Sequence, residues 1–442
     1  MRRLAVMNHS VLRPSLTFAV IAFLSRAAMA GVVGSGTPTS CTEAALQAQI
    51  PNGGTITFNC GTGPQTIAFT NSMGVGATNP KVTIDGGDTI TLDGTGLTSG
   101  MVSVGGSATS LPDVTFRHIT FANGNISTGL IAGGAIQNFG KLTLDTVTFT
   151  KNQGVGGGVI FQELCTGCPN TSLTITHCLF QNNTASGSGG AIAMEGGNAS
   201  VTDSTFSGNS AQRSGAIEIF GNATFPVVMS IDRCTFNGNS ATSVNGGAIG
   251  VEVLNANSSV TIRNSTFTGN TATAANALGA AIYIGSAPVT ITNCTIAGNT
   301  TAGSGGAVYF GNGTPVTAMN NTIISSNTGG NCKLAGGSTF TGGHNLQFGD
   351  STCSGVTVAN PLLSPLADNG GLTQTMALGA GSPAIDGGDT GVAPPTDQRG
   401  VLRNDGNGDG ILAADIGAFE AAKATGGNIP PPPMRRHSVR PH

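Results

Sequence analysis

Length, composition and charge limit the classes to which this chain can belong. Only 9% of its 442 residues are charged, against about 25% in an average soluble domain. Between residues 31 and 420, ten basic residues stand against twenty-one acidic ones. A nucleic-acid-binding protein needs the opposite charge, so nucleic acid is excluded as the expected partner.

The first thirty residues predict an export signal. Three arginines precede the apolar segment 16–24, and Ala28-Met29-Ala30 is a small-x-small cleavage site. The apolar run of about nine residues is too short to span a bilayer. We therefore expect residues 1–30 to be removed. The mature protein is then secreted or held at the cell surface, with no membrane span of its own.

Residues 31–80 are expected to form an N-terminal cap and the first strands. Ser40 and Glu43 have the spacing of a capping box ahead of the sequence AALQAQI, which predicts a short helix over the first coil. The sequences TITF and IAF that follow are interpreted as the first strands. A helix at this end would block an open sheet edge, which otherwise invites aggregation.

An internal repeat occupies residues 81–359 and decides the fold. Its first element is the tetrapeptide F-x-x-N after a short apolar strand, at intervals of 26–31 residues. Its second element is GGAI or a close variant, and its third is a VTI-like strand ahead of the phenylalanine. Three short strands at this period predict one coil of a parallel β-helix, an all-β solenoid. A propeller blade would need four strands and about 40 residues.

The residues of the repeat indicate which side of each strand is buried. Alternate side chains of a strand point inward, so the apolar residues of GGAI and VTI and the phenylalanine are expected to stack into one core. The asparagine of F-x-x-N is expected in the left-handed backbone region, hydrogen-bonded to its equivalent one coil away. The threonine before each phenylalanine is expected to belong to an outward ladder.

The nine cysteines of a chain with an export signal are interpreted first as pairs. We expect one disulfide at each end of the repeat: Cys41–Cys60 and Cys332–Cys353. Cys165 and Cys168 are a further candidate pair, either as a local disulfide or as half of a zinc site. The sequence has no second CxxC, which disfavours the metal. Three cysteines that share a repeat position are expected to fill the apolar core: Cys178, Cys234 and Cys294.

Two parts of the chain resemble known families. The paired F-x-x-N and GGA[I/L/V] tetrapeptides resemble the repeats of the polymorphic outer-membrane protein family. The stretch 360–420, with NPLLSPLADNGGLTQTMAL, GSPAIDGGD, TDQRG and DIGAFE in that order, resembles a choice-of-anchor Q domain. These resemblances imply a pectate-lyase-like right-handed β-helix on an exported bacterial protein, closed by a C-terminal cap. They imply no reaction, because a fold does not fix a chemistry.

The last segment, residues 421–442, is expected to be a disordered extension. It contains four consecutive prolines followed by basic residues. It shows no apolar anchor and no sorting signal. We therefore expect a monomer that is freely secreted, or that is attached through another molecule.

Four glutamates are the candidate site residues with the sharpest chemistry. Aligning the GGAI strands places Glu163, Glu195 and Glu252 in one column, that is, at the same position of different coils. Glu218 lies two residues away from that column. All four are expected to face outward, with Glu163 and Glu195 stacked about 5 Å apart. Two carboxylates at such a short distance raise each other's pKa or recruit a cation. The alternative is a set of solvated surface glutamates, since no evident catalytic base shares the face.

Two further groups are candidate binding sites. Tyr283 and Tyr309 fall in one column on successive coils and form a candidate stacking site for a sugar. Three residues resemble the start of a calcium loop, with an acid at position eleven instead of twelve: Asp405, Asn407, Asp409 and then Asp415. A turn without metal is the alternative, and no other cofactor is expected.

The other charged residues are interpreted as structural. His118 and His177 share a repeat position and are expected in turns or on the surface. Two cross-strand ion pairs are expected: Arg117–Asp145 and Asp232–Arg263. A network that closes the last coils is expected from Asp386, Asp389, Asp397 and Arg399.

Three functions remain open at this point. The favoured one is a non-enzymatic, adhesin-like protein that binds extracellular polysaccharide or another cell-surface component. The second is a polysaccharide lyase or glycosidase that acts through Glu163, Glu195 and Glu218. The third is a purely structural envelope protein without a specific ligand.

Overall fold

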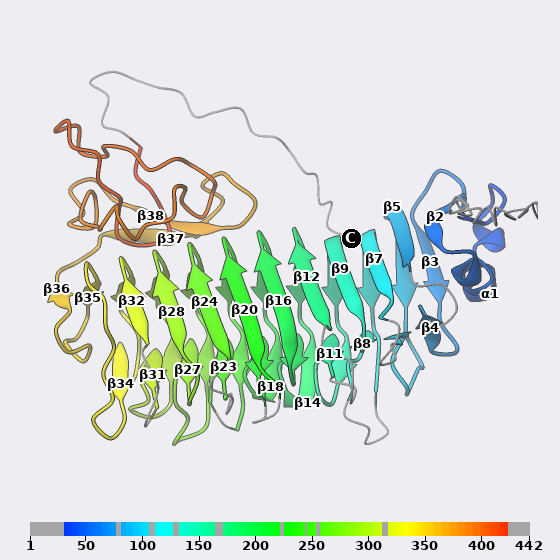
Figure 1. Cartoon of the computed structure of the whole chain (residues 1–442), viewed down its shortest axis with the longest axis horizontal. Coiled ribbons are helices and arrows are strands. Elements are labelled where there is room, and N and C mark those ends of the chain that lie inside the picture. The colour runs from blue at the N-terminus through cyan, green and yellow to red at the C-terminus, as the bar shows by residue number, and fades with distance from the viewer. Residues whose placement is uncertain are drawn as a thin grey trace, which may run out of the picture.

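The computed structural model describes residues 31–76, 81–105, 111–126, 132–163, 171–221, 225–243, 245–252, 257–311 and 317–422. These residues form one long stack of coils with parallel strands (Figure 1). The predicted export signal, Cys165 and Cys168, and nearly all of the predicted tail lie outside the described residues. The described residues contain no helix that is long and apolar enough to cross a membrane.

The ten-stranded sheet forms one face of the stack and carries the isoleucines of the GGAI motifs. Each strand pairs in parallel with its equivalent in the next coil. In spatial order its strands are β4 (Met73–Val75), β6 (Val102–Val104), β8 (Ile136–Asn138), β11 (Ile160–Gln162), β15 (Ile192–Met194), β19 (Ile217–Ile219), β23 (Ile249–Val251), β27 (Ile282–Ile284), β31 (Val308–Phe310) and β34 (Cys332–Leu334).

The twenty-stranded sheet carries the VTI strands and the phenylalanines of the repeat, and most coils contribute two strands to it. Its strands are β1 (Gly31–Val33), β2 (Gly54–Phe58), β3 (Gln65–Ala68), β5 (Lys81–Asp93), β7 (Asp113–Ala122), β9 (Lys141–Thr150), β12 (Ser172–Thr176), β13 (Leu179–Gln181), β16 (Gly197–Thr202), β17 (Thr205–Ser207), β20 (Val227–Asp232), β21 (Thr235–Asn237), β24 (Ser259–Arg263), β25 (Thr266–Thr268), β28 (Val289–Thr292), β29 (Thr295–Ala297), β32 (Ala318–Asn320), β33 (Ile323–Ser325), β35 (Leu346–Phe348) and β36 (Thr357–Val358).

A six-stranded sheet completes the coils in the middle of the stack. Its strands are β10 (Gln153–Gly154), β14 (Thr184–Ser188), β18 (Ser210–Arg213), β22 (Ser240–Ala241), β26 (Thr271–Ala272) and β30 (Thr300–Thr301). The described chain thus confirms an all-β parallel solenoid with three strand-bearing regions in each central coil.

The core is one continuous column of apolar side chains, as the repeat predicts. The phenylalanine rings of successive coils stack in parallel, with centroids 4.6 Å apart between Phe180 and Phe206 and again between Phe236 and Phe267. Cys178, Cys234 and Cys294 are buried free thiols in the same core. Burial raises the pKa of the Cys178 thiol to about 12, so these cysteines pack as small apolar groups.

The asparagines of F-x-x-N form the predicted ladder inside the coil. Each side-chain amide donates to the side-chain oxygen of its equivalent in the next coil, at 2.9 Å from Asn209 to Asn239 and from Asn239 to Asn270. The predicted left-handed backbone is wrong by one residue, because it occurs at the residue before each asparagine. Those residues are Lys151, Asn182, Gly208, Gly238, Gly269 and Gly298.

The glycine pair of GGAI serves two separate purposes, which Gly246 and Gly247 illustrate. Gly246 has a φ of 77°, in the left-handed region that the turn requires. Gly247 has a different constraint, since a Cβ there would lie 1.9 Å from the carbonyl oxygen of Ala280 in the next coil. The second glycine is therefore explained by the close approach of two backbones.

The N-terminal end carries the expected short helix, but with a different cap. Two 3-10 turns, Pro38–Ser40 and Ile50–Asn52, flank the helix α1 (Glu43–Gln47). The N-cap is Thr42, whose hydroxyl accepts from the amide of Ala45 at 3.2 Å, so the predicted capping box of Ser40 and Glu43 is wrong. Glu43 instead accepts from the amide of Thr70 at 2.8 Å and thereby ties the helix to the loop after β3.

Both predicted end disulfides are present. Cys41 and Cys60 join the segment before α1 to the end of β2, with their Cα atoms 5.6 Å apart. Cys332 and Cys353 join β34 to the segment after β35, with their Cα atoms 4.8 Å apart. One crosslink therefore lies in the first coil and the other in the last coils of the described chain.

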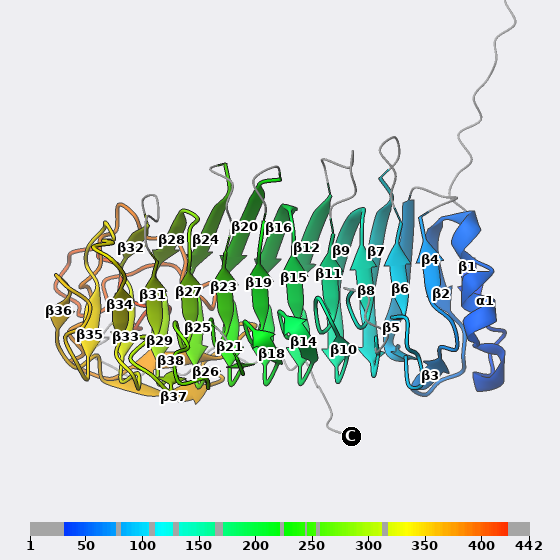
Figure 2. The ribbon, with the colours of Figure 1, turned by 90° about the horizontal axis from the view of Figure 1, so that it is seen from below.

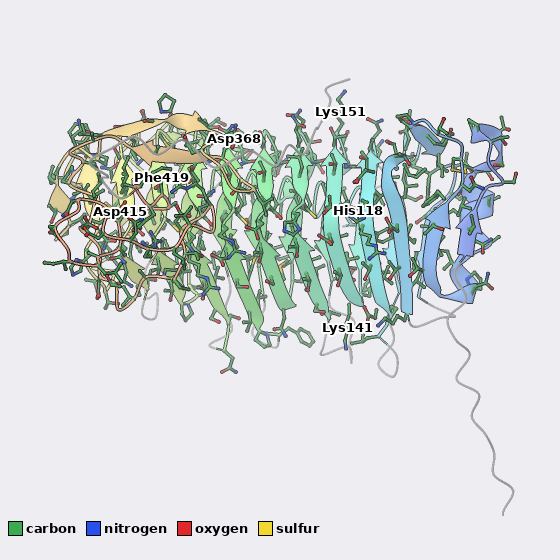
Figure 3. All side chains as sticks on the ribbon, turned by 90° about the horizontal axis from the view of Figure 1, so that it is seen from above. His118, Lys141, Lys151, Asp368, Asp415 and Phe419 are labelled. Carbon is green, nitrogen blue, oxygen red and sulfur yellow. A yellow bond between two sulfur atoms is a disulfide. The ribbon has the colours of Figure 1, made fainter. Side chains whose placement is uncertain are left out.

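Residues 360–422 run back along the side of the solenoid, as Figures 1 and 3 show. They include the antiparallel pair β37 (Leu363–Ala367) and β38 (Thr375–Leu378). Threonines of the predicted outward ladder hold this segment: Thr235 donates to the carbonyl oxygen of Gln374 at 2.6 Å, and Thr266 donates to the side chain of Gln398 at 2.7 Å. The segment expected to cap the last coil therefore covers part of one lateral face.

Candidate functional site

The candidate site lies on the outer surface of the ten-stranded sheet, which faces the viewer in Figure 2. The central residue of each strand points outward because its two neighbours point into the core. Strand pairing places these central residues in one column, which we call the central column. From β8 to β34 it reads Gln137, Phe161, Ala193, Glu218, Gly250, Tyr283, Tyr309 and Lys333.

A second column, two residues further along each coil, holds the other glutamates. Glu163 and Glu195 follow Gln162 and Met194, which are paired, so the two glutamates lie on adjacent coils as predicted. Phe220 follows in the next coil, and Glu252 in the one after. We call this the glutamate column. Its members are partly exposed, which leaves them available to a ligand.

The pKa values of Glu163 and Glu195 are both raised from the usual range of a glutamate. Partial burial is the larger cause for Glu195, and the charge of Glu163 adds to it. For Glu163 partial burial raises the pKa, while a hydrogen bond from the side-chain amide of Gln137 opposes it. The two neighbouring carboxylates therefore interact electrostatically, as the sequence indicated.

Glu218 departs from the expectation that all four glutamates face solvent. Only 2% of this residue is exposed, and the hydroxyl of Ser214 donates to its Oε2. Burial raises the pKa of Glu218 to about 8, and the charge of Glu252 also raises it, whereas the bond from Ser214 and the charge of Arg213 lower it. The carboxyl group therefore keeps its proton at neutral pH.

Glu218→Gln is expected to stabilise the protein at alkaline pH and to change little at acid pH. The pKa of this carboxyl is about 8 in the folded protein and about 4.3 in an unfolded chain. The folded state therefore binds the extra proton between these values, and the free energy of unfolding falls as the pH rises through that window, by about 3–5 kcal/mol, before it levels off. Glutamine has no such proton to lose.

Thermal unfolding of wild type and Glu218→Gln at about pH 4 and about pH 9 checks this. The control is Glu195→Gln, because Glu195 is only partly buried. Parallel pH profiles for wild type and Glu218→Gln would contradict it.

The two tyrosines stack as the sequence predicted. The ring centroids of Tyr283 and Tyr309 are 5.1 Å apart and the rings are within 5° of parallel. Burial is the largest cause that raises the pKa of Tyr283, and the charge of Glu252 is the next. The tyrosine pair and Glu252 therefore belong to one neighbourhood on this face.

Two basic residues complete the face. Arg213, at the end of β18, donates to Glu252 at 2.8 Å, and both side chains are partly exposed. Lys333 pairs in register with Tyr309 and is exposed. Sequence reasoning missed Lys333 because its coil lacks the GGAI motif, so no motif aligns its strand with that of Tyr309.

The predicted calcium residues lie in a loop whose oxygens already accept backbone hydrogen bonds. The carboxylate of Asp405 accepts from the amides of Gly408 and Gly410, at 2.7 and 2.9 Å. The side-chain oxygen of Asn407 accepts from the amide of Asp409 at 2.8 Å. Among the described residues no group of His, Cys, Asp or Glu side chains has the arrangement of a metal site. This geometry favours the turn, and calcium binding stays a prediction.

Asp415 borders that loop at Gly406 and belongs to a buried network of the C-terminal segment. Its carboxylate accepts from the amides of Asp386 and Ala421, at 2.8 and 2.5 Å. Burial and then the charge of Glu420 raise the pKa of Asp415 to about 7. The four residues predicted to form a calcium site are thus divided between two structural roles.

The network expected around Asp397 is present and structural. Asp397 pairs with Arg399 at 2.7 Å and accepts from the amide of Glu420 at 2.9 Å. The guanidinium of Arg399 lies 3.7 Å from the ring centroid of Phe419. Asp386 accepts from the amides of Gly406 and Asn407. These bonds hold the C-terminal segment together along the side of the solenoid.

The two histidines lie on the surface, each with a positive φ and an aspartate partner, His118 within β7 and His177 in the bend after β12. His118 Nδ1 is 3.2 Å from Asp85, and His177 Nδ1 is 3.0 Å from Asp145. Arg117 pairs in register with Asp145, but its ion pair at 2.9 Å is with Asp85 in the preceding coil. The Asp232–Arg263 pair is present at 3.5 Å.

A second surface feature was not singled out from the sequence. A shallow depression of about 250 Å³ lies on the twenty-stranded sheet, over β12, β16, β20 and β24. Its lining includes hydroxyl side chains of Thr174, Ser200, Ser230 and Thr261 and no charged residue. Thr or Ser occupies this strand position in most coils, so the sequence pattern alone gives no reason to prefer these four.

Comparisons with known proteins agree with the fold. Residues 190–360 match the family model described as "Right handed beta helix region". The solenoid is a right-handed parallel β-helix. Residues 177–195 match the "Chlamydia polymorphic membrane protein (Chlamydia_PMP) repeat", in agreement with the first predicted resemblance. Both matches end at or before residue 360. The resemblance of residues 360–420 to a choice-of-anchor Q domain therefore stays a prediction.

The search of curated proteins finds no match for this chain. A solved structure titled "Structure of PL6 family alginate lyase AlyGC" is similar, with a TM-score of 0.40 and 14% sequence identity. The likeness covers 78% of this chain and 55% of that one, so this chain spans little more than half of that protein's length. A likeness of this degree supports no inference about activity.

Proposed function

We propose that this protein is an exported β-helix that binds an extracellular polysaccharide along the outer surface of its ten-stranded sheet, without cleaving it. One observation carries the proposal: both tyrosines of the chain stack on this face, beside the Arg213–Glu252 pair and Lys333. Stacked aromatic rings with adjacent polar groups are suited to contact a sugar ring and its hydroxyls.

The shape of the face suits a polymer. Columns on a parallel solenoid are straight, and coils repeat every ~4.8 Å. Along the axis, the exposed or partly exposed residues of the face are first those of the glutamate column and then those at the far end of the central column: Glu163, Glu195, Phe220, Glu252, Tyr283, Tyr309 and Lys333. A chain molecule lying along the axis would meet them in sequence, whereas a compact ligand would meet only one or two.

The arrangement of acid and base argues against turnover. Catalysis of glycosidic cleavage needs an acid and a base, or a nucleophile, at the same bond. Glu218 is the protonated acid of this face, but only 2% of this residue is exposed, so it does not reach a glycosidic oxygen of a polymer on the surface. Arg213 is not available as a base, because it is paired with Glu252 and keeps its proton at all physiological pH values.

A glycan array with folded protein tests the proposal, with the Tyr283→Ala/Tyr309→Ala double variant as the comparison. We expect wild type to bind at least one polysaccharide and the double variant to lose about tenfold or more in affinity. Circular dichroism of both proteins confirms that the coils are intact. A blank array for folded wild type, or equal binding by the double variant, would contradict the proposal.

The same polysaccharides also test the enzymatic alternative. Glu218 favours this alternative, because a protonated carboxyl group can serve as a general acid. Each polysaccharide is incubated with the protein and assayed for new reducing ends and unsaturated products. We expect none. Cleavage by wild type that disappears in Glu218→Gln would establish the enzyme instead.

A further inference from the structure

The shallow depression on the twenty-stranded sheet is the candidate for a second binding surface. It has a volume of about 250 Å³ and extends over four neighbouring strands, β12, β16, β20 and β24 (Figure 1). Strands about 4.8 Å apart give it a length of about 14 Å along the solenoid axis. Eight outward side chains in two columns line it: Ser172, Asn198, Val228 and Ser259 in one, which we call the Asn198 column, and Thr174, Ser200, Ser230 and Thr261 in the other, which we call the Ser200 column.

The hollow lies where the Ser200 column changes its residue type. Pairing in register gives this column threonine on β9 and β12, serine on β16 and β20, and threonine again on β24 and β28. Serine lacks the γ-methyl group of threonine, so two successive serines leave the surface lower than on either side. The depression is therefore a local feature of these coils and not a consequence of the repeat.

The Asn198 column loses its charges over the same strands. Its three preceding coils carry Lys81, Asp113 and Lys141, whereas its residues from β12 to β24 are uncharged. Val228 of this column is 45% exposed, and it is the one exposed large apolar side chain that the structure describes between residues 81 and 357. An apolar contact and a lack of charge thus coincide with the hollow.

The polar groups of the depression are available to a ligand. Thr174 and Asn198 are exposed, and their side chains, like that of Thr261, have no hydrogen bond to another described residue. The hydroxyl of Ser230 donates to that of Ser200 at a long 3.3 Å. Because a hydroxyl group both donates and accepts, this lining suits the hydroxyl groups of a carbohydrate. It contains no charged residue that would pair with an ionic ligand.

We propose that this depression is a second carbohydrate site, which binds a short stretch of an uncharged polysaccharide lying along the solenoid axis. The site goes beyond the proposed function, since it lies on another sheet and does not involve the tyrosines. Sugar hydroxyls bond to Thr174, Asn198 and Thr261, and CH groups of the sugar contact Val228. This is the weaker of the two sites, because no aromatic ring lines it.

Calorimetric titration of the Tyr283→Ala/Tyr309→Ala double variant tests the depression by itself, because this variant lacks the stacked rings of the ten-stranded sheet. The titrants are uncharged hexasaccharides of glucose, mannose and galactose at millimolar concentration, with oligogalacturonate as the acidic comparison. We expect at least one uncharged hexasaccharide to bind more tightly than oligogalacturonate. Adding Ser200→Val/Ser230→Val should lower that affinity about tenfold or more, since it fills the hollow and removes two hydroxyls while keeping residues that favour a strand.

Thr83→Val/Thr115→Val in the same background is the matched control. These threonines precede the depression in the Ser200 column, on β5 and β7, so the change removes two hydroxyls and fills nothing. It should leave the affinity within about twofold. Circular dichroism checks that each variant folds. Should the filled variant not fold, Val228→Lys decides, because Lys141 already occupies this column on β9, and the introduced charge should lower the affinity to a similar extent.

Three results would overturn the second site: no binding of any uncharged hexasaccharide by the folded tyrosine double variant, a preference for oligogalacturonate, or equal losses in the filled and control variants. Each of them leaves the proposed function in place, since that function depends on the affinity that wild type loses with its tyrosines. Equal binding by wild type and the tyrosine double variant, with a loss on filling the hollow, would instead contradict the proposed function and support this site.

Discussion

The Asn239→Ala variant is expected to lose about 3–5 kcal/mol of unfolding free energy. The Asn239 side chain donates to the carbonyl oxygen of Phe206 at 3.0 Å and to Asn270 Oδ1 at 2.9 Å. It accepts from the backbone amide of Asn209 at 3.1 Å and from its side-chain amide at 2.9 Å. Alanine leaves the Asn209 amide and the Phe206 carbonyl buried without these partners, which costs about 1–3 kcal/mol for each group.

Urea denaturation followed by circular dichroism measures this loss. Asn237→Ala is the matched control, because Asn237 lies two residues earlier on β21 and is partly exposed. The control should change the free energy by less than about 0.5 kcal/mol. An Asn239→Ala variant as stable as its control would mean that the ladder serves register and contributes no net stability.

The Arg403→Met variant is expected to release the C-terminal segment from the solenoid. Arg403 donates to Glu420 at 2.7 Å, with 4% and 0% of the two side chains exposed. It also donates to Asn264 at 3.1 Å, and so joins the segment to the corner between β24 and β25. Removing one partner of a buried ion pair leaves an uncompensated charge, at a cost of about 3–5 kcal/mol.

Hydrogen exchange with mass spectrometry locates the effect. Peptides from residues 397–421 should exchange much faster in the variant, while peptides from β12 to β17 should be unchanged. Arg263→Met is the control, since Arg263 is 48% exposed and lies 3.5 Å from Asp232, and a pair of that kind contributes less than about 1 kcal/mol. Slow exchange throughout the Arg403→Met variant would show that the other contacts, such as those of Thr235, Thr266 and Asn293, hold the segment without Arg403.

Docking of the C-terminal segment bears on the proposed function. The segment covers the ladder of Thr235, Thr266 and Thr295 on the twenty-stranded sheet. The tyrosines and the glutamate column belong to a different sheet, the ten-stranded one. The two predictions are therefore separable: release of the segment should leave glycan binding unchanged, and loss of Tyr283 should leave hydrogen exchange of the segment unchanged.

The repeat by itself determined the solenoid, the register and most of the columns. In a parallel solenoid each residue contacts its own equivalent in the next coil, so sequence alignment of the repeats is also an alignment in space. The phenylalanine stack, the asparagine ladder, the tyrosine pair and the column of Glu163, Glu195 and Glu252 all follow from that rule. The two end disulfides were likewise within reach, because their cysteines lie at the two ends of the repeat region.

The tertiary structure decided what repetition does not encode. Alternation places Glu218 on the outer side, but its burial depends on the missing side chain at Gly250 one coil away and on Ser214 before it in the chain. Lys333 joined the site through backbone pairing at a coil that lacks the repeat motif. The C-terminal segment has no repeat at all, and its position depends on single contacts between residues more than 120 positions apart, such as Ala418 with Thr295. Local patterns carry no information on such contacts, since they form only when two finished surfaces meet.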